Sequence, residues 1–192
     1  MPPHASGSND IITSFHAMPR EIGFFIVPEF EILDLTGPLS AFRMVEMTDG
    51  TRPYRLRVVS EAGGAVVSTA WLEITTEKLA ALRFDTLIVV GGRGARLDPQ
   101  PETRLDAIRS ATTRTRRIAS VCTGAFILAA AGLLDQRQAT THWRHAAALQ
   151  RRYPGVRVDG DRIFIRDGAI WTSAGITAGI DLALAMIEAD HG

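Results

Sequence analysis

The single cysteine of the 192-residue chain, Cys122, stands where one hydrophobic pattern gives way to another. The run Arg117–Val121 before it is typical of a buried strand, and the Ala- and Leu-rich stretch Ala125–Leu134 after it is typical of a helix. A thiol at the start of a helix lies near unpaired backbone N–H groups, which stabilise the thiolate and lower the thiol pKa. The pattern predicts a nucleophile at a strand-turn-helix elbow, and the alternative is a small buried cysteine that only packs.

Asp34 is the candidate acid, because it lies in the segment that follows the first expected strand, Ile22–Val27. A carboxyl group beside a thiolate is shifted toward its protonated form by the negative charge and by burial, and it can then donate a proton to a substrate. The alternative is a turn or helix-capping role, which is ordinary for an aspartate before Leu-Thr-Gly-Pro.

Backbone amides are the third candidate component of the site. The expected strand Thr86–Val90 runs directly into a glycine-rich turn, where the chain can approach a ligand closely. The amide of Thr123, with that of Gly92 or Arg93, would form an oxyanion hole. The candidate ligand-binding residues are Gly91, Gly92, Arg93, Gly124 and His142, and for His142 the alternative is a packed structural role.

The remaining elements alternate along the chain. Residues 1–20 are small and polar and are expected to be a mobile leader, with one domain at 21–192. Leu35–Phe42 indicates a loop leading into a helix. Further strands are expected at Leu56–Ser60, Ala65–Ser68, Arg162–Arg166 and Ala169–Ser173, and helices at Glu77–Leu82, Pro101–Thr115, Arg144–Arg152 and from Gly175 onward.

Strands alternating with helices predict an α/β fold with a doubly wound, mostly parallel sheet covered by helices on both faces. In such sheets the ligand site lies beyond the carboxyl ends of the strands, near the point where the strand order reverses. The glycine turn, Cys122 and Asp34 should therefore meet in one cleft.

The composition excludes several other classes of function. There are 21 basic and 21 acidic residues, so no net charge attracts the chain to nucleic acid or to a membrane surface. We expect no membrane span, no secretion signal and no internal disulfide, which together favour the cytoplasm. The histidines, His4, His16, His142, His145 and His191, do not have the spacing of a metal site, and we expect neither a metal nor a cofactor.

Several motifs in order resemble those of the ThiJ/PfpI superfamily, whose fold is that of the class I glutamine amidotransferases (flavodoxin-like). The resemblance extends from about Glu21 to the last residue. It rests on Glu31-Ile32-Leu33-Asp34-Leu35-Thr36-Gly37-Pro38, Val89-Val90-Gly91-Gly92, Ser120-Val121-Cys122-Thr123-Gly124-Ala125, Ala139-Thr140-Thr141-His142-Trp143 and Thr172-Ser173-Ala174-Gly175-Ile176-Thr177-Ala178-Gly179-Ile180-Asp181.

Two branches of that superfamily share these motifs. In isocyanide hydratases a cysteine attacks the isocyanide carbon and an acid assists proton transfer, which the resemblance assigns to Cys122 and Asp34. In AraC-type transcription regulators a similar N-terminal domain senses a small ligand. The segments Tyr153–Asp159 and Ile187–Gly192 look more like the regulator branch. The peptidase and chaperone members carry histidine directly after the cysteine, and Thr123 at that place argues against a protease.

Three functions remain open at this stage. The favoured one is a ligand-sensing domain of an AraC-type regulator, whose DNA binding would lie in a C-terminal domain absent from this chain. The second is a cysteine-dependent hydratase that uses Cys122, Asp34 and Thr123, and the third is a redox sensor whose thiol is oxidised. A homodimer is expected from the resemblance, with a small-molecule ligand or substrate as the other partner.

Overall fold

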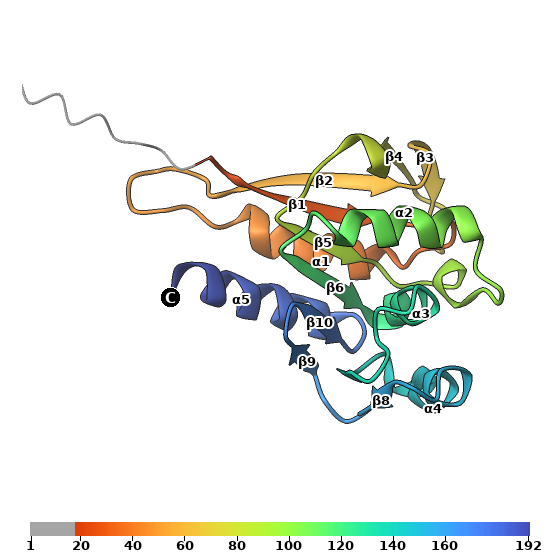
Figure 1. Cartoon of the computed structure of the whole chain (residues 1–192). Coiled ribbons are helices and arrows are strands. Elements are labelled where there is room, and N and C mark those ends of the chain that lie inside the picture. Colours follow the sequence, from red (N-terminus) through yellow and green to blue (C-terminus); the bar gives the residue numbers. More distant parts are fainter. Residues whose placement is uncertain (1–17) are drawn as a thin grey trace, which may run out of the picture.

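The computed structural model describes residues 18–192, so residues 1–17 of the expected leader lie outside the described residues. An eight-stranded sheet runs through the middle of the described part of the chain, in the order β3-β4-β2-β1-β5-β6-β10-β9 (Figure 1). The strands are β1 (Arg20–Phe25), β2 (Tyr54–Ser60), β3 (Gly64–Val67), β4 (Glu73–Lys78), β5 (Thr86–Val89), β6 (Arg117–Val121), β9 (Phe164–Asp167) and β10 (Ile170–Ser173).

The sheet is mostly parallel, as the sequence predicts. Neighbouring strands from β4 to β10 in the sheet order are parallel, and only the outer pairs β3–β4 and β9–β10 are antiparallel. β2 lies on one side of β1 in the sheet, and β5 and β6, which come later in the chain, lie on the other side. The strand order therefore reverses between β1 and β5, which is where a ligand site is expected in such a sheet.

Helices cover both faces of the sheet. α1 (Ile32–Arg43) packs beside α5 (Thr177–His191), whereas α2 (Glu102–Thr112) and α3 (Ala125–Ala130) pack on the other face (Figure 1). Adjacent residues of β1 are buried on opposite faces of the sheet. Phe24 belongs to the core under α1 and α5, and Phe25 belongs to the core under α2 and α3. The continuous apolar runs of β1 and β5 are explained by this two-sided burial.

A smaller two-stranded sheet stands at the β9 end. It is formed by β7 (Gln138–Ala139) and β8 (Arg157–Val158), and α4 (Trp143–Arg152) lies between them in the chain. The predicted hairpin between β9 and β10 is confirmed: the strands are antiparallel and Gly168 in their turn has φ +63°.

Three elements differ from the sequence prediction. The helix expected at Glu77–Leu82 is wrong, because β4 extends through Lys78 and pairs with both β2 and β3, which leaves only the short 3₁₀ turn η1 (Leu79–Ala81). The loop expected at Leu35–Phe42 lies inside α1, which begins at Ile32 and contains Pro38. α3 ends at Ala130, short of the expected Leu134.

Candidate functional site

Cys122 directly follows β6 and opens the 3₁₀ turn η3 (Cys122–Gly124), after which α3 begins. Its φ is +56°, a left-handed conformation that is uncommon for residues with a side chain. The turn is fixed on both sides, because the N–H of Cys122 donates to the Ala174 carbonyl at 3.2 Å and its own carbonyl accepts from the Thr141 hydroxyl at 2.7 Å. The side chain is largely covered, with 7% of the residue exposed.

Asp34 lies in the first turn of α1 rather than in a loop, and it is fully buried. Its Oδ1 accepts the backbone N–H of Ile176 at 2.8 Å, which joins α1 to the turn before α5. Its Oδ2 has no hydrogen-bond partner within residues 18–192, and the carboxyl interacts electrostatically with the Cys122 thiol. The structure thus brings together the acid and the nucleophile that the sequence suggests.

Gly91 makes this close approach possible. A Cβ built on Gly91 would lie 2.7 Å from the Thr123 nitrogen, 2.8 Å from Cys122 Cβ and 2.9 Å from Asp34 Oδ2. All three distances are shorter than the van der Waals contacts that a Cβ atom makes. Only glycine at this position therefore leaves room for the thiol and the carboxyl beside the end of β5.

The pKa values of the two groups rise together. Burial raises the pKa of the Asp34 carboxyl, although the Ile176 N–H opposes the shift. Burial and then the Asp34 carboxylate raise the pKa of the Cys122 thiol. The sequence-based expectation of a thiol pKa lowered by a helix N-terminus is therefore wrong, because desolvation and a neighbouring carboxylate outweigh the backbone of one short turn. The Cys122 thiol therefore retains its proton at neutral pH.

Two of the expected oxyanion donors, the amides of Gly92 and Arg93, are already engaged within the protein. The Thr123 hydroxyl accepts from the N–H of Gly92 at 2.8 Å and donates to the Gly92 carbonyl at 2.9 Å. The N–H of Arg93 donates to the Glu29 carbonyl at 2.9 Å. Neither of these two amides is free to stabilise an oxyanion, and Thr123 and Gly92 are instead joined by a clasp of two hydrogen bonds.

His142 and the Cys122 thiol both lie against Gly175, and both line the same cavity. A Cβ on Gly175 would lie 2.5 Å from His142 Cδ2 and 3.1 Å from Cys122 Sγ. His142 caps the N-terminus of α4, where its Nδ1 accepts the Arg144 N–H at 3.2 Å, and its ring stacks on Trp143. Burial, followed by Arg144, lowers the pKa of His142, so the ring is neutral at pH 7.

A cavity of about 170 Å³ opens over the thiol. Sequence reasoning identified five of its lining residues, Gly92, Arg93, Cys122, Thr123 and His142, and missed the other five, Glu31, Thr69, Arg96, His145 and Ile176. Gly91 and Gly124 do not line this cavity. Gly91 packs beneath it, and Gly124 packs against the carbonyl of Val89, where a Cβ would clash.

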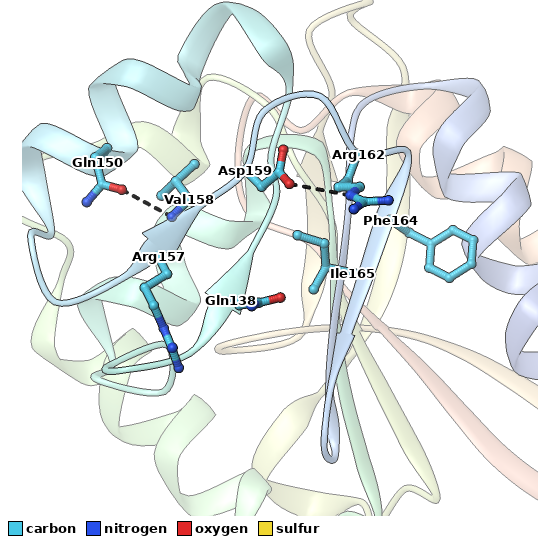
Figure 2. Close-up of a pocket in the computed structure, with 8 residues that line it drawn as sticks. All are labelled: Gln138, Gln150, Arg157, Val158, Asp159, Arg162, Phe164 and Ile165. Carbon is cyan, nitrogen blue, oxygen red and sulfur yellow. Dashed lines mark hydrogen bonds and ion pairs between the residues drawn. The ribbon is translucent and has the colours of Figure 1, made fainter.

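A larger cavity of about 600 Å³ lies elsewhere, between the β7–β8 sheet and β9 (Figure 2). Its lining side chains include Gln138, Arg157 and Ile165, with Asp159 paired to Arg162 at 3.4 Å. None of the residues singled out from the sequence lines it. The cavity over Cys122 is smaller but is the one lined by the candidate nucleophile, with the candidate acid Asp34 buried beside the thiol.

Residues 18–192 contain neither a candidate membrane span nor a candidate metal site. None of their helices is long and apolar enough to cross a membrane. Their histidine, cysteine, aspartate and glutamate side chains include no cluster of three or more that could hold a metal ion.

Comparison with known proteins gives matches over nearly the whole described range. The model of the DJ-1/PfpI family matches residues 20–189. Isonitrile hydratase of Pseudomonas putida is 36% identical over 173 residues, which is 89% of this chain and 72% of the hydratase. The HTH-type transcriptional regulator GbdR of Pseudomonas aeruginosa is 33% identical over 176 residues, which is 91% of this chain and 47% of the regulator.

Among solved structures, a ThiJ/PfpI family protein from Pseudomonas syringae superposes with a TM-score of 0.75 at 27% identity, over 97% of this chain and 76% of that one. The matches therefore include both an isonitrile hydratase and a transcriptional regulator, and this chain spans about half the length of the regulator.

Proposed function

Because the chain belongs to the DJ-1/PfpI family, we propose that its cavity over Cys122 binds a small molecule and that the domain senses this ligand for a transcription regulator. The observation that carries this proposal is the clasp between Thr123 and Gly92: a cavity stands over the thiol, while the amides of Gly92 and Arg93 are already hydrogen-bonded within the protein. Such a site can hold a ligand without turning it over. The regulators among the relatives support the same role.

In this proposal DNA binding belongs to a separate helix-turn-helix domain, and the sensing domain pairs with a second copy of itself. Ligand occupancy would be transmitted through the Asp34–Ile176 hydrogen bond, because that bond connects the cavity to α1 and α5.

Isocyanide hydration is the second candidate, and the Asp34–Cys122 pair is the specific observation in its favour. The sulfur would form a bond to the isocyanide carbon while one proton of the pair moves to the same carbon, giving a thioimidate. Water would then add to that carbon and release the formamide and the free thiol. This sequence needs a nucleophile and one mobile proton but no oxyanion hole.

A redox-sensing role is less well supported. Oxidation follows thiolate character and exposure, and here the thiol pKa is raised and the residue is largely covered.

The test uses tert-butyl isocyanide with the wild type and with Cys122→Ser. We expect the isocyanide to slow alkylation of the wild-type thiol by iodoacetamide, followed by intact mass, without formation of the formamide. If the formamide accumulates with the wild type and not with Cys122→Ser, the sensing proposal is wrong and the domain is a cysteine-dependent hydratase. Unchanged alkylation with no formamide would contradict binding of this probe at the cavity.

A further inference from the structure

Arg96 is an uncompensated cation beside the candidate nucleophile. It is the last residue of the 3₁₀ turn η2 (Gly94–Arg96) and lines the Cys122 cavity, where it is half-buried. Its guanidinium makes no hydrogen bond or ion pair with any residue from 18 to 192. A guanidinium that is partly removed from water and lacks a counter-ion attracts an anion strongly, because the local dielectric constant is low.

Glu31 is the only acidic side chain that lines the cavity, and no ion pair joins it to Arg96 within residues 18–192. Arg93 is paired with Glu29 at 3.4 Å, and Glu31 accepts the Thr69 hydroxyl at 3.1 Å. Burial lowers the pKa of both His142 and His145, and the charge of Arg96 contributes to each shift. With both imidazoles neutral, the positive charges of this lining are Arg93, which is exposed and paired with Glu29, and Arg96, which is half-buried and has no ion-pair partner within residues 18–192.

We propose that the ligand of the Cys122 cavity carries a carboxylate that pairs with Arg96. This inference rests on the proposed function, since it assigns a chemical class to the molecule that the cavity binds. A guanidinium presents parallel N–H donors that match the two oxygens of a carboxylate. The cavity of about 170 Å³ lies below the roughly 300–1,000 Å³ of sites for drug-sized ligands, so the carboxylate belongs to a small metabolite.

The single cysteine provides a direct test, because iodoacetate and iodoacetamide alkylate the same sulfur and differ in one negative charge. In both reactions the thiolate sulfur attacks the methylene carbon, iodide leaves and the thiol proton passes to water. The raised thiol pKa slows both reagents equally, so it cancels in the ratio of the two rates. That ratio, measured at pH 9 by intact mass and divided by the ratio for the urea-unfolded chain, reports the preference of the cavity for an anion.

We expect the normalised ratio to favour iodoacetate by about ten-fold in the wild type. Arg96→Gln should bring it close to one, and Arg96→Lys should keep most of the preference because the charge remains. Arg144→Gln is the matched control: Arg144 is an exposed arginine that stacks on Trp143 near the same site but does not line the cavity. It should leave the ratio within about two-fold of the wild type.

The outcomes separate the inference from the proposed function. A wild-type ratio near one, or an equal ratio in wild type and Arg96→Gln, would overturn the carboxylate assignment while the cavity remains a binding site. If neither reagent alkylates the folded protein at pH 9, the thiol is not reachable through the cavity, and both the proposed function and this inference are contradicted.

Discussion

The side chain of Asp34 accepts the backbone N–H of Ile176 at 2.8 Å, across 142 positions of sequence. This bond holds the carboxyl of α1 against the turn before α5 and leaves the second carboxylate oxygen for the Cys122 thiol. Ile176 itself lines the cavity. The cavity, the Asp34 carboxyl and the helices α1 and α5 are therefore connected through this one hydrogen bond.

Asp34→Asn should lower the pKa of the Cys122 thiol. Burial is the largest cause of the raised thiol pKa, and the Asp34 charge is the next, so removing the charge removes part of the shift. The amide oxygen of asparagine can still accept the Ile176 N–H, which preserves the fold. The pH dependence of iodoacetamide alkylation measures the pKa, and Glu73→Gln removes an exposed carboxylate of β4 as a control. A thiol pKa that rises in Asp34→Asn would instead show a protonated Asp34 donating to the thiolate.

Thr123→Val should destabilise the fold by about 1–3 kcal/mol, because the N–H and the carbonyl of Gly92 both lose a buried partner. Thr123→Ser keeps the hydroxyl and should cost less. Urea denaturation of the two variants gives the comparison. Equal losses would mean that the methyl group of Thr123, and not its hydroxyl, holds the turn.

Hydrophobic pattern predicted the central strands well because β1, β5 and β6 are buried on both faces and read as continuous apolar runs. It failed for β4, where only Thr76 is buried and the strand exists because β2 and β3 supply its hydrogen bonds. The local propensity of a segment does not show which other strands will pair with it.

The same distinction applies to the site. Cys122 and Asp34 could be identified because thiols and carboxylates carry chemistry wherever they occur. Arg96 could not, because one arginine after a glycine turn has no distinguishing pattern, and only the folded chain shows that it lacks a partner. The engagement of the Gly92 amide by Thr123 is likewise a tertiary fact, and it reverses the role expected for that amide.

Ile176→Gly should stabilise the protein. Ile176 has φ +57° and ψ −106°, a conformation that is strained for a β-branched residue and natural for glycine. Its side chain is 43% exposed, so little burial is lost. We expect a net gain of about 1 kcal/mol and a Tm about 2–4 °C higher by calorimetry. Ile176→Ala loses the same side chain but keeps the strained Cβ, and a gain of equal size there would contradict the strain argument.

Asp190→Asn should weaken the fold and reduce its sensitivity to acid. Asp190 ends α5 with its side chain only 1% exposed, and it pairs with Arg117 at 2.9 Å at the start of β6. Burial alone would raise the pKa of Asp190, but Arg117 and Arg116 more than offset this and lower it. Because the folded-state pKa lies below the unfolded value of about 3.9, the stabilisation is complete above that pH and is lost as pH falls through the folded pKa.

At pH 7 we expect Asp190→Asn to cost about 3–5 kcal/mol, since it leaves the buried Arg117 guanidinium without its counter-charge. Urea denaturation at a series of pH values should show the difference from wild type shrinking below about pH 4. Asp181→Asn, on the exposed side of the same helix, should change stability by less than about 0.5 kcal/mol. A deficit in Asp190→Asn that stays constant down to pH 2 would show that packing, rather than the charge of Asp190, anchors the end of α5.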